Sequence, residues 1–286
     1  MNKPLPLFPA PAAPPQSAPA RTRILEILAG TAGWRSGEDI SAALGISRAA
    51  VAKHVAALRA DGHAIDAATR RGYMLRVLRE RLDGDDLAAR LGTRRFGKQG
   101  WRILEETEST NLDAAALARS GTFTEGYVVF AERQSAGRGR KGNSWLSLPR
   151  GVQFSVLLRP DAAHWNAEDM TAVGARAVAA AVRECCGLDA VFKQPNDVFV
   201  NGRKLSGVLV ETAMRGTEPE WAVLGIGCNV NALPEDFPAE SAGRFTSLLG
   251  ETGVVQDRAR LLIAILEKLE QGYDAMQAGE REPFAN

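Results

Sequence analysis

Cysteine and histidine are scarce in this sequence, with three of each among 286 residues. Cys185 and Cys186 are adjacent and Cys228 stands apart, so the Cys-x-x-Cys spacing of zinc sites is absent. Adjacent cysteines are also poorly placed to bridge each other. We therefore expect no metal site and no disulfide framework, but buried, reduced thiols of the kind found in the cytoplasm.

Excess charge and long apolar runs are also missing. Lys and Arg total 35 and Asp and Glu total 34, so any basic surface for nucleic acid must be local. No basic N-terminal region precedes an apolar run, and no apolar run is long enough to span a bilayer. The sequence predicts a soluble, cytoplasmic protein with no membrane partner.

Length and composition indicate more than one domain. The 286 residues exceed the size of an ordinary domain, and 45% of them are hydrophobic, which suffices for a buried core. Seven prolines fall within the first twenty residues and predict a disordered or polyproline-like leader. The predicted divisions are the leader (1–20), a small helical domain (21–78), a linker (79–100) and a larger domain (101–286).

The small domain has the pattern of a winged helix-turn-helix. Ser36 and Ser47 precede two short apolar-faced helices, and Gly45 separates them. A hairpin is expected around residues 70–72, whose two arginines would make a basic wing. The residues predicted to lie at a DNA interface are Ser36, Ser47, Arg48, Lys53 and His54. A three-helix domain whose charges merely face water remains the alternative.

Residues 135–147, here called the glycine loop, alternate three glycines with three cations and end beside Trp145. Glycine lets backbone N–H groups approach an anion, and arginine suits phosphate and carboxylate. An indole can stack on a nucleobase. The pattern indicates an anion clamp beside an aromatic surface, and the missing Gly-Lys-Ser/Thr ending excludes a Walker A loop. A solvated basic turn or a nucleic-acid contact is the competing interpretation.

The larger domain mixes strands joined by hairpins, such as the one at Asn201-Gly202, with strands joined by helices. This predicts an α+β domain built on a mixed sheet, with its helices on one side. Polar and glycine-rich stretches end several predicted strands, at residues 109–111, 134–145, 193–197 and 201–207. Loops that converge at strand ends usually form the site of a sheet enzyme. They hold no His or Cys, which excludes Ser–His or Cys–His nucleophiles and favours the binding of anionic groups.

These stretches, in this order, resemble the bifunctional biotin–protein ligases that also repress biotin synthesis. The likeness includes residues 36–55, the Glu-Ser-Thr-Asn sequence at 108–111, the glycine loop and the Lys-Gln-Pro-Asn-Asp sequence at 193–197. Residues 203–211 and 225–230 complete it. The resemblance implies a class II synthetase-like catalytic domain after the helix-turn-helix. It also implies a biotin–[biotin carboxyl-carrier protein] ligase that uses ATP, biotin and Mg²⁺ to make biotinyl-5′-AMP.

The resemblance further implies partners and residue roles. The acceptor would be a lysine of a biotin carboxyl carrier protein, and the biotinyl-AMP-bound protein would dimerise on operator DNA as a repressor. The residues implied in biotin binding are Ser109, Thr110, Asn111, Gln134, Arg138, Gly139, Arg140 and Lys204. Those implied in catalysis are Lys204, Arg140, Asp197 and Lys193. Those implied in adenine binding are Trp145 and Asn229.

Three departures from the family pattern leave alternatives open. Gln194 stands where the family has Trp, and Asn143-Ser144 replaces a basic pair. The sequence ends where the family continues into a small C-terminal β-barrel, so we expect that domain to be absent. A biotin-sensing DNA-binding repressor with weak or no ligase activity is therefore the main alternative. A ligase that no longer binds DNA and a lipoate-ligase-like enzyme are the others.

Overall fold

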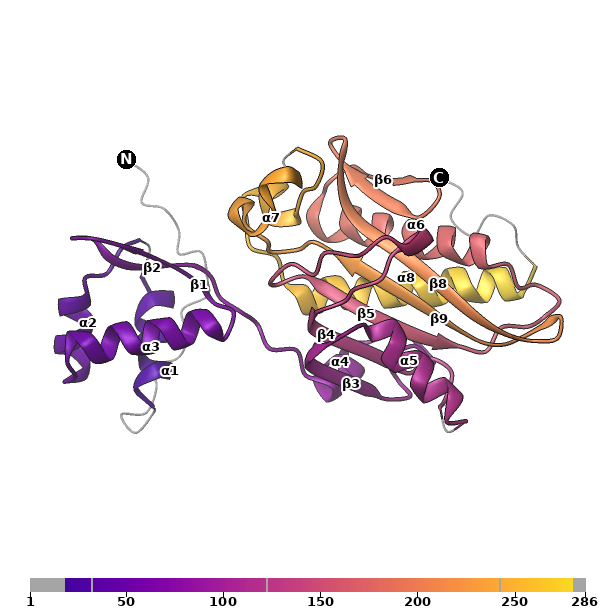
Figure 1. Cartoon of the computed structure of the whole chain (residues 1–286), viewed down its shortest axis with the longest axis horizontal. Helices are drawn as coiled ribbons and strands as arrows, with labels where there is room; N and C mark the ends of the chain where they lie inside the picture. Colours follow the sequence, from indigo (N-terminus) through magenta and orange to yellow (C-terminus); the bar gives the residue numbers. More distant parts are fainter. Residues whose placement is uncertain (1–18, 32, 122, 242, 280–286) are drawn as a thin grey trace. The chain divides into compact units, whose positions relative to one another are not determined.

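The computed structural model describes residues 19–31, 33–121, 123–241 and 243–279. The chain divides into two compact units, Met1–Glu80 and Arg81–Asn286 (Figure 1). Most of the expected leader, residues 1–18, lies outside the described residues, and Ala20 already begins the first helix. No helix in the described ranges is long and apolar enough to cross a membrane.

Within its described residues, the first unit has three helices and a hairpin, as the helix-turn-helix pattern predicts. They are α1 (Ala20–Ala29), α2 (Gly37–Leu44), α3 (Arg48–Ala60), β1 (Ala64–Ala68) and β2 (Gly72–Val77). Ser36 Oγ accepts the N–H of Asp39 and so caps α2, and Gly45 ends that helix in the left-handed conformation. The strands pair antiparallel across the turn at residues 69–71, which confirms the predicted wing hairpin.

The second unit is built on a seven-stranded mixed sheet in the order β3-β4-β5-β9-β8-β7-β6. Only the β3–β4 pair is parallel. The strands are β3 (Trp101–Thr107), β4 (Val128–Gln134), β5 (Val152–Leu158), β6 (Ala190–Lys193), β7 (Asp197–Val200), β8 (Arg203–Arg215) and β9 (Glu218–Cys228). The helices are α4 (Gly84–Arg90), α5 (Thr110–Arg119), α6 (Ala167–Cys186), α7 (Leu248–Thr252) and α8 (Arg258–Gln277), with 3-10 turns at Arg140–Gly142, Pro234–Asp236 and Ala239–Ser241. These elements confirm the α+β prediction.

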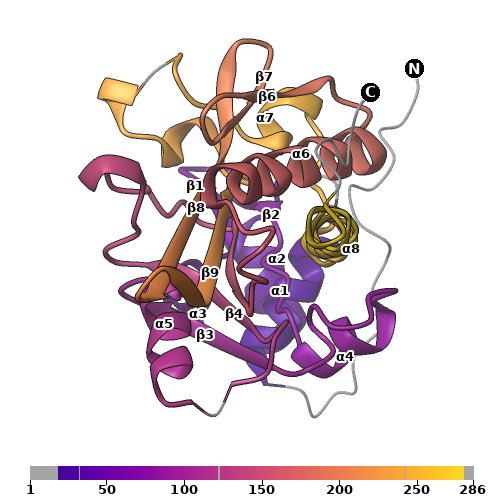
Figure 2. The ribbon, with the colours of Figure 1, turned by 90° about the vertical axis from the view of Figure 1, so that its right-hand side faces the viewer.

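Helices cover both faces of this sheet, so the expectation of helices on one side is wrong. Alternate residues of a strand point to opposite faces. Val156 and Leu158 of β5 belong to the large core with α6 and α8, whereas Leu157 belongs to a smaller cluster with Ala114 of α5. Figure 2 shows α6 and α8 on one side of the strands and α5 on the other. The face that carries α5 also carries the candidate site.

The predicted linker, residues 79–100, belongs from Arg81 onward to the second unit. Leu87 of α4 and Phe96 are fully buried in the large core. Carboxylates of α8 hold the backbone that follows α4: Glu267 accepts the N–H of Gly92, and Glu270 accepts the N–H groups of Arg94, Arg95 and Phe96. Because these partners lie more than 170 residues away in the chain, a local reading of a charged segment mistakes it for a connector.

Candidate active site

A cavity of about 140 Å³ opens on the α5 face of the sheet, and three glycines form much of its floor beside Leu209. Gly207 of β8 and Gly225 and Gly227 of β9 line it, and Ser155 of β5 pairs with Gly225. A Cβ atom at Gly225 would come within 2.0 Å of Asn111 Oδ1. One at Gly227 would come within 2.3 Å of the indole of Trp145. Glycine therefore lets polar and aromatic groups lie directly against the sheet.

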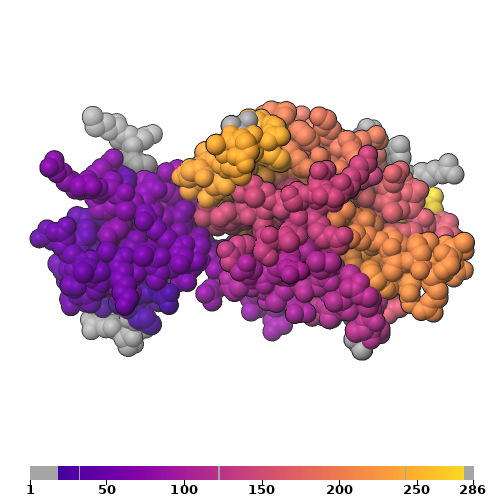
Figure 3. Space-filling model, viewed as in Figure 1, coloured from indigo at the N-terminus to yellow at the C-terminus, as the bar shows by residue number. Residues whose placement is uncertain are grey.

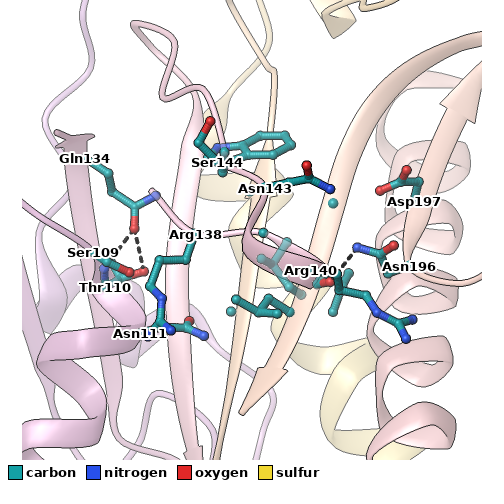
Figure 4. Close-up of a pocket in the computed structure, with 18 of the residues that line it drawn as sticks. Ser109, Thr110, Asn111, Gln134, Arg138, Arg140, Asn143, Ser144, Asn196 and Asp197 are labelled. Atoms are coloured by element: carbon teal, nitrogen blue, oxygen red, sulfur yellow. Dashed lines mark hydrogen bonds between the residues drawn. The ribbon is translucent and has the colours of Figure 1, made fainter. Parts of the chain in front are cut away.

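The N-terminus of α5 forms a polar wall of this cavity. Gln134 Oε1 at the end of β4 accepts the backbone N–H of Thr110 at 2.8 Å and its hydroxyl at 3.1 Å (Figure 4). The hydroxyl of Ser155 lies 2.8 Å from Thr110 Oγ1 and 2.7 Å from Asn111 Oδ1. Ser109 lines the cavity and its hydroxyl makes no hydrogen bond within the described ranges. Four of the predicted biotin-binding residues therefore lie together.

The glycine loop forms the opposite wall. It folds back on itself: Gly139 N–H donates to Asn143 O and Trp145 N–H donates to Gly137 O, each at 2.8 Å. Arg138 NH1 lies 2.8 Å from Glu211 Oε1, and Figure 4 shows its side chain extending toward Asn111. Arg140 also lines the cavity and lies 3.7 Å from the exposed Glu168. In Figure 3 the magenta part of the chain, which includes the loop, lies on the face turned to the viewer.

Trp145 lies on the glycine floor rather than away from it. A Cβ atom at Gly207 would be 3.3 Å from its ring, and Lys204 Nζ is 5.8 Å from the ring centroid. Its indole N–H is buried and has no hydrogen-bond partner among the residues described. A buried donor without a partner costs free energy. Movement of this side chain to contact a ligand would therefore be favoured.

Lys204 and Asp197 form the charged end of the cavity. Lys204 Nζ lies 2.7 Å from Asp197 Oδ1, and both side chains are about one quarter exposed, at 24% and 25%. The backbone of Lys204 is held on both sides, because its N–H donates to Arg244 O and its carbonyl accepts the N–H of Thr246. An ammonium group fixed in this way can face an anion without reorganising.

Two predicted residues are not brought to the cavity. Lys193 is exposed, does not line the cavity, and its Nζ lies 4.7 Å from the ring centroid of Phe199. Asn229 is buried, and its amide donates to Thr246 O at 3.1 Å. The predicted catalytic role of Lys193 therefore finds no support in its position. The side chain of Asn229 instead anchors the segment that holds Lys204.

The predicted DNA-contacting residues divide into two groups. The hydroxyls of Ser36 and Ser47 cap α2 and α3, accepting the N–H groups of Asp39 and Ala50. Arg48 and Lys53 are exposed on α3, and His54 is half-buried. In the wing, the guanidinium of Arg71 lies 4.5 Å from the ring centroid of Trp34.

Sequence reasoning missed two residues that contact the cavity lining without lining the cavity themselves, Ser155 and Glu211. Glu211 lies on β8, accepts a hydrogen bond from the side-chain amide of Asn111 and forms an ion pair with Arg138. The available signal was strand periodicity, because Glu211 shares the face of Gly207 and ends an apolar run with a carboxylate. Ser155 interrupts the apolar strand β5 in the same way and pairs with Gly225.

The three cysteines lie outside this site and are free thiols. Cys228 is buried, while Cys185 and Cys186 are half-buried, so the predicted burial is complete for one of the three. Burial raises the pKa of Cys228 and of Cys185, and it raises the pKa of Cys186 to about 11. These groups are thiols at neutral pH and are poor nucleophiles.

Comparison with known proteins finds the same two parts. Residues 104–229 match the Biotin/lipoate A/B protein ligase family, and residues 21–74 match an HTH domain. The chain is 36% identical over 239 residues to the bifunctional ligase/repressor BirA of Bacillus subtilis, covering 83% of this chain and 73% of that protein. It is also 36% identical over 179 residues to the biotin--[acetyl-CoA-carboxylase] ligase of Mycobacterium tuberculosis, covering 60% of this chain and 64% of that one.

Among solved structures, a biotin protein ligase from Aquifex aeolicus in complex with biotin and ATP aligns with a TM-score of 0.56 and 30% identity. The alignment covers 64% of this chain and 74% of that chain. The resemblance inferred from the sequence motifs is thereby confirmed for both parts of the chain.

Proposed function

Because this chain belongs to the family of bifunctional biotin ligase/repressors, we propose that it activates biotin with ATP and transfers it to a carrier-protein lysine. We further propose that the biotinyl-AMP-bound form represses transcription. The observation that supports the ligase part best is one cavity that combines hydrogen-bonding groups, a glycine-rich floor and three cations, Arg138, Arg140 and Lys204.

In the first step, a carboxylate oxygen of biotin attacks the α-phosphorus of ATP. The bond to the β-phosphate breaks and pyrophosphate leaves, giving biotinyl-5′-AMP. Both reactants are anions, so their repulsion must be neutralised before they meet. Lys204 is placed for this by its fixed backbone and by Asp197, which orients its ammonium. Arg138 and Arg140 supply further positive charge from the glycine loop.

The ureido ring of biotin needs donors for its carbonyl and acceptors for its two N–H groups. We assign this recognition to Ser109, Thr110, Asn111 and Gln134. The free hydroxyl of Ser109 and the amide nitrogen of Gln134, whose oxygen is already engaged, are available donors. We assign Trp145 to stacking on the adenine ring of ATP. Its indole lies against Gly207 and Gly227, and its buried N–H has no partner among the described residues.

In the second step, the amine of an acceptor lysine attacks the acyl carbon and AMP leaves with the bonding electron pair. The acyl-phosphate anhydride is labile in water, so the cavity must exclude water until the acceptor arrives. The glycine loop is suited to cover it, because its tip contacts the rest of the domain through few side chains. The acceptor that this chemistry implies is a biotin carboxyl carrier protein.

Magnesium would arrive with the phosphates of ATP. Within the described ranges, no group of three or more His, Cys, Asp or Glu side chains could hold a metal ion. Asp197 is the single carboxylate among the described residues that line the cavity, and it already pairs with Lys204. This fits the usual manner of Mg²⁺, which binds mostly to substrate phosphates and water. Its contribution there is to neutralise phosphate charge.

The repressor part rests on the first unit. Exposed Arg48 and Lys53 lie on α3, where the second helix of a helix-turn-helix meets the major groove. The wing adds Arg70 and Arg71. Because such units read paired half-sites, we propose a homodimer on operator DNA, stabilised by bound biotinyl-AMP. We propose the cytoplasm as the site of this activity, because it needs ATP, a carrier protein and operator DNA.

The test of the ligase is pyrophosphate release by the purified protein. Release should require biotin, ATP and Mg²⁺ together, and labelled biotin should then pass to a carrier domain with its acceptor lysine. A carrier whose lysine is replaced by arginine is the control. If neither step occurs and DNA binding still responds to biotin, the ligase proposal fails and the biotin-sensing repressor is the better interpretation.

A further inference from the structure

We infer that Glu211 is a positioning residue for the proposed reaction, which holds Arg138 and thereby keeps the glycine loop closed against the cavity. The inference rests on the proposed function for its purpose, but the contacts that support it are independent of any substrate. Glu211 itself does not line the cavity and touches no proposed reacting atom.

The carboxylate of Glu211 joins the two walls of the site. Oε2 accepts the amide N–H of Asn111 at 2.8 Å, and Oε1 lies 2.8 Å from NH1 of Arg138. Asn111 is nearly fully buried at the N-terminus of α5, so it fixes the carboxylate from the rigid side. Arg138 belongs to the glycine loop, so the other oxygen faces the movable side.

The carboxylate of Glu211 lies in a row of apolar side chains that runs across the sheet. Glu211 pairs with Val223 of β9, which pairs in turn with Leu157 of β5. Val223 and Leu157 both belong to the apolar cluster under α5. A leucine at 211 would continue that row, whereas a half-buried carboxylate carries a desolvation cost that its two partners offset.

The rest of the loop shows why one ion pair matters. The root is tied by its backbone, with Ser135 and Ala136 donating to the carbonyls of Thr107 and Glu108. Beyond the root, the tip contacts the described sheet and helices closely through Trp145 on the floor and Arg138 at Glu211. Arg140 has only the 3.7 Å contact to Glu168, whose side chain is 84% exposed. Loss of the Glu211 contact would leave the indole as the main restraint on the tip.

The direct test is limited trypsin digestion of the full-length protein without substrates. Trypsin can cut this loop after Arg138, Arg140 and Lys141, so cleavage is followed at the bonds after Arg140 and Lys141, which every variant keeps. Glu211→Gln should speed this cleavage about two- to fivefold at low salt, because local opening exposes the bond. High salt should bring the wild-type rate toward that of the variant, because the ion pair is partly exposed.

Matched variants separate this role from a general loss of stability. Glu220→Gln removes a carboxylate from the same β8–β9 hairpin, where it pairs with Arg215 at the exposed surface, and should leave loop cleavage unchanged. Arg138→Gln breaks the same contact from the loop without altering the sheet. If Glu211 acts through Arg138, the double variant should be cut no faster than Arg138→Gln alone.

A second measurement connects the contact to the reaction. Glu211→Gln should release bound biotinyl-AMP about two- to fivefold faster and raise the KM for biotin, with little change in kcat. If wild-type protein makes no adenylate, the proposed function fails while the digestion still decides the role of Glu211. Loop cleavage at the wild-type rate in both Glu211→Gln and Arg138→Gln would overturn the inference and leave the ligase proposal intact.

Discussion

The ammonium group of Lys204 lies 2.7 Å from the carboxylate of Asp197 on the adjacent strand β7, although Lys204 pairs in register with Phe199 and Asp197 with Gly207. The register of the β7–β8 pair shifts between Val198 and Phe199, and the backbone N–H and carbonyl of Lys204 bond to Arg244 and Thr246. A shift of this kind re-aims a side chain. Lys204 is thereby presented to the cavity with its charge oriented.

Replacing Lys204 with Gln should lower the rate of adenylate formation by roughly a hundredfold or more, because charge stabilisation in the transition state is lost. Biotin binding, which rests mainly on the α5 wall, should weaken much less. Pyrophosphate release measures the first effect and calorimetry with biotin the second. Lys268→Gln, which removes a lysine paired with Glu184 on the surface, is the control. A Lys204→Gln protein with the wild-type rate would remove Lys204 from the mechanism.

Replacing Gly225 with Ala should abolish measurable biotin binding. The new Cβ atom would lie 2.0 Å from Asn111 Oδ1, so Asn111 would have to leave its contacts with Ser155 and Glu211. Overpacking of this kind costs about 1–3 kcal/mol of stability, which a thermal melt would detect. Gly37→Ala is the control, because its Cβ atom meets Tyr73 at an ordinary 3.6 Å. Binding retained by Gly225→Ala would mean that the ligand does not use this floor.

Replacing Lys53 with Ala should weaken operator binding and reduce the salt dependence of that binding by about one counterion. Ser47→Ala should behave differently. Its hydroxyl caps α3, so the variant should lose about 1 kcal/mol of stability, and its DNA affinity should fall only as the helix frays. Gel shifts over a range of salt concentrations and urea unfolding separate the two effects. An unchanged salt slope in Lys53→Ala would exclude a phosphate contact there.

Protein stability should fall between about pH 9 and pH 11, partly through Cys186. Burial raises the pKa of this thiol from its ordinary 9.0 to about 11. Above pH 9 the unfolded chain loses the proton while the native chain keeps it, so the unfolded state binds fewer protons and gains in stability. Urea unfolding at pH 8 and pH 10.5 should show a smaller loss for Cys186→Ala than for wild type. Equal losses would mean that Cys186 is more accessible than its position indicates.

Local features of the fold were predictable from the sequence because they depend on neighbouring residues. Ser36, Ser47 and Gly45 set the ends of their helices through bonds within a few residues. Asn201-Gly202 likewise forms the turn between β7 and β8. The motifs that resemble biotin ligases also predicted most of the cavity lining, since Ser109 to Asn111, the glycine loop, Asp197 and Lys204 converge on it.

What depends on distant contacts was not predictable. Glu211 acquires its partners from α5 and from the glycine loop, which lie 100 and 73 residues away in the chain, respectively. The placement of α5 opposite α6 and α8 is set by which residues of β5 and β9 face it, and an apolar strand with both faces buried gives no sign of this. Lys193 shares a motif with Asp197, but the β6–β7 hairpin leaves it exposed.

Carboxylates of α8 accept hydrogen bonds from the backbone of residues 92–96, and these bonds determine where the chain can be divided into two folding units. The ligase unit includes the segment before Trp101, which is hydrogen-bonded to α8. The boundary between the two units therefore lies between Glu80 and Arg81. A ligase fragment that begins at Arg81 keeps these hydrogen bonds. A fragment that begins at Trp101 would expose the side of α8 that carries Glu270 and would lack Phe96 of the core. We expect that fragment to misfold.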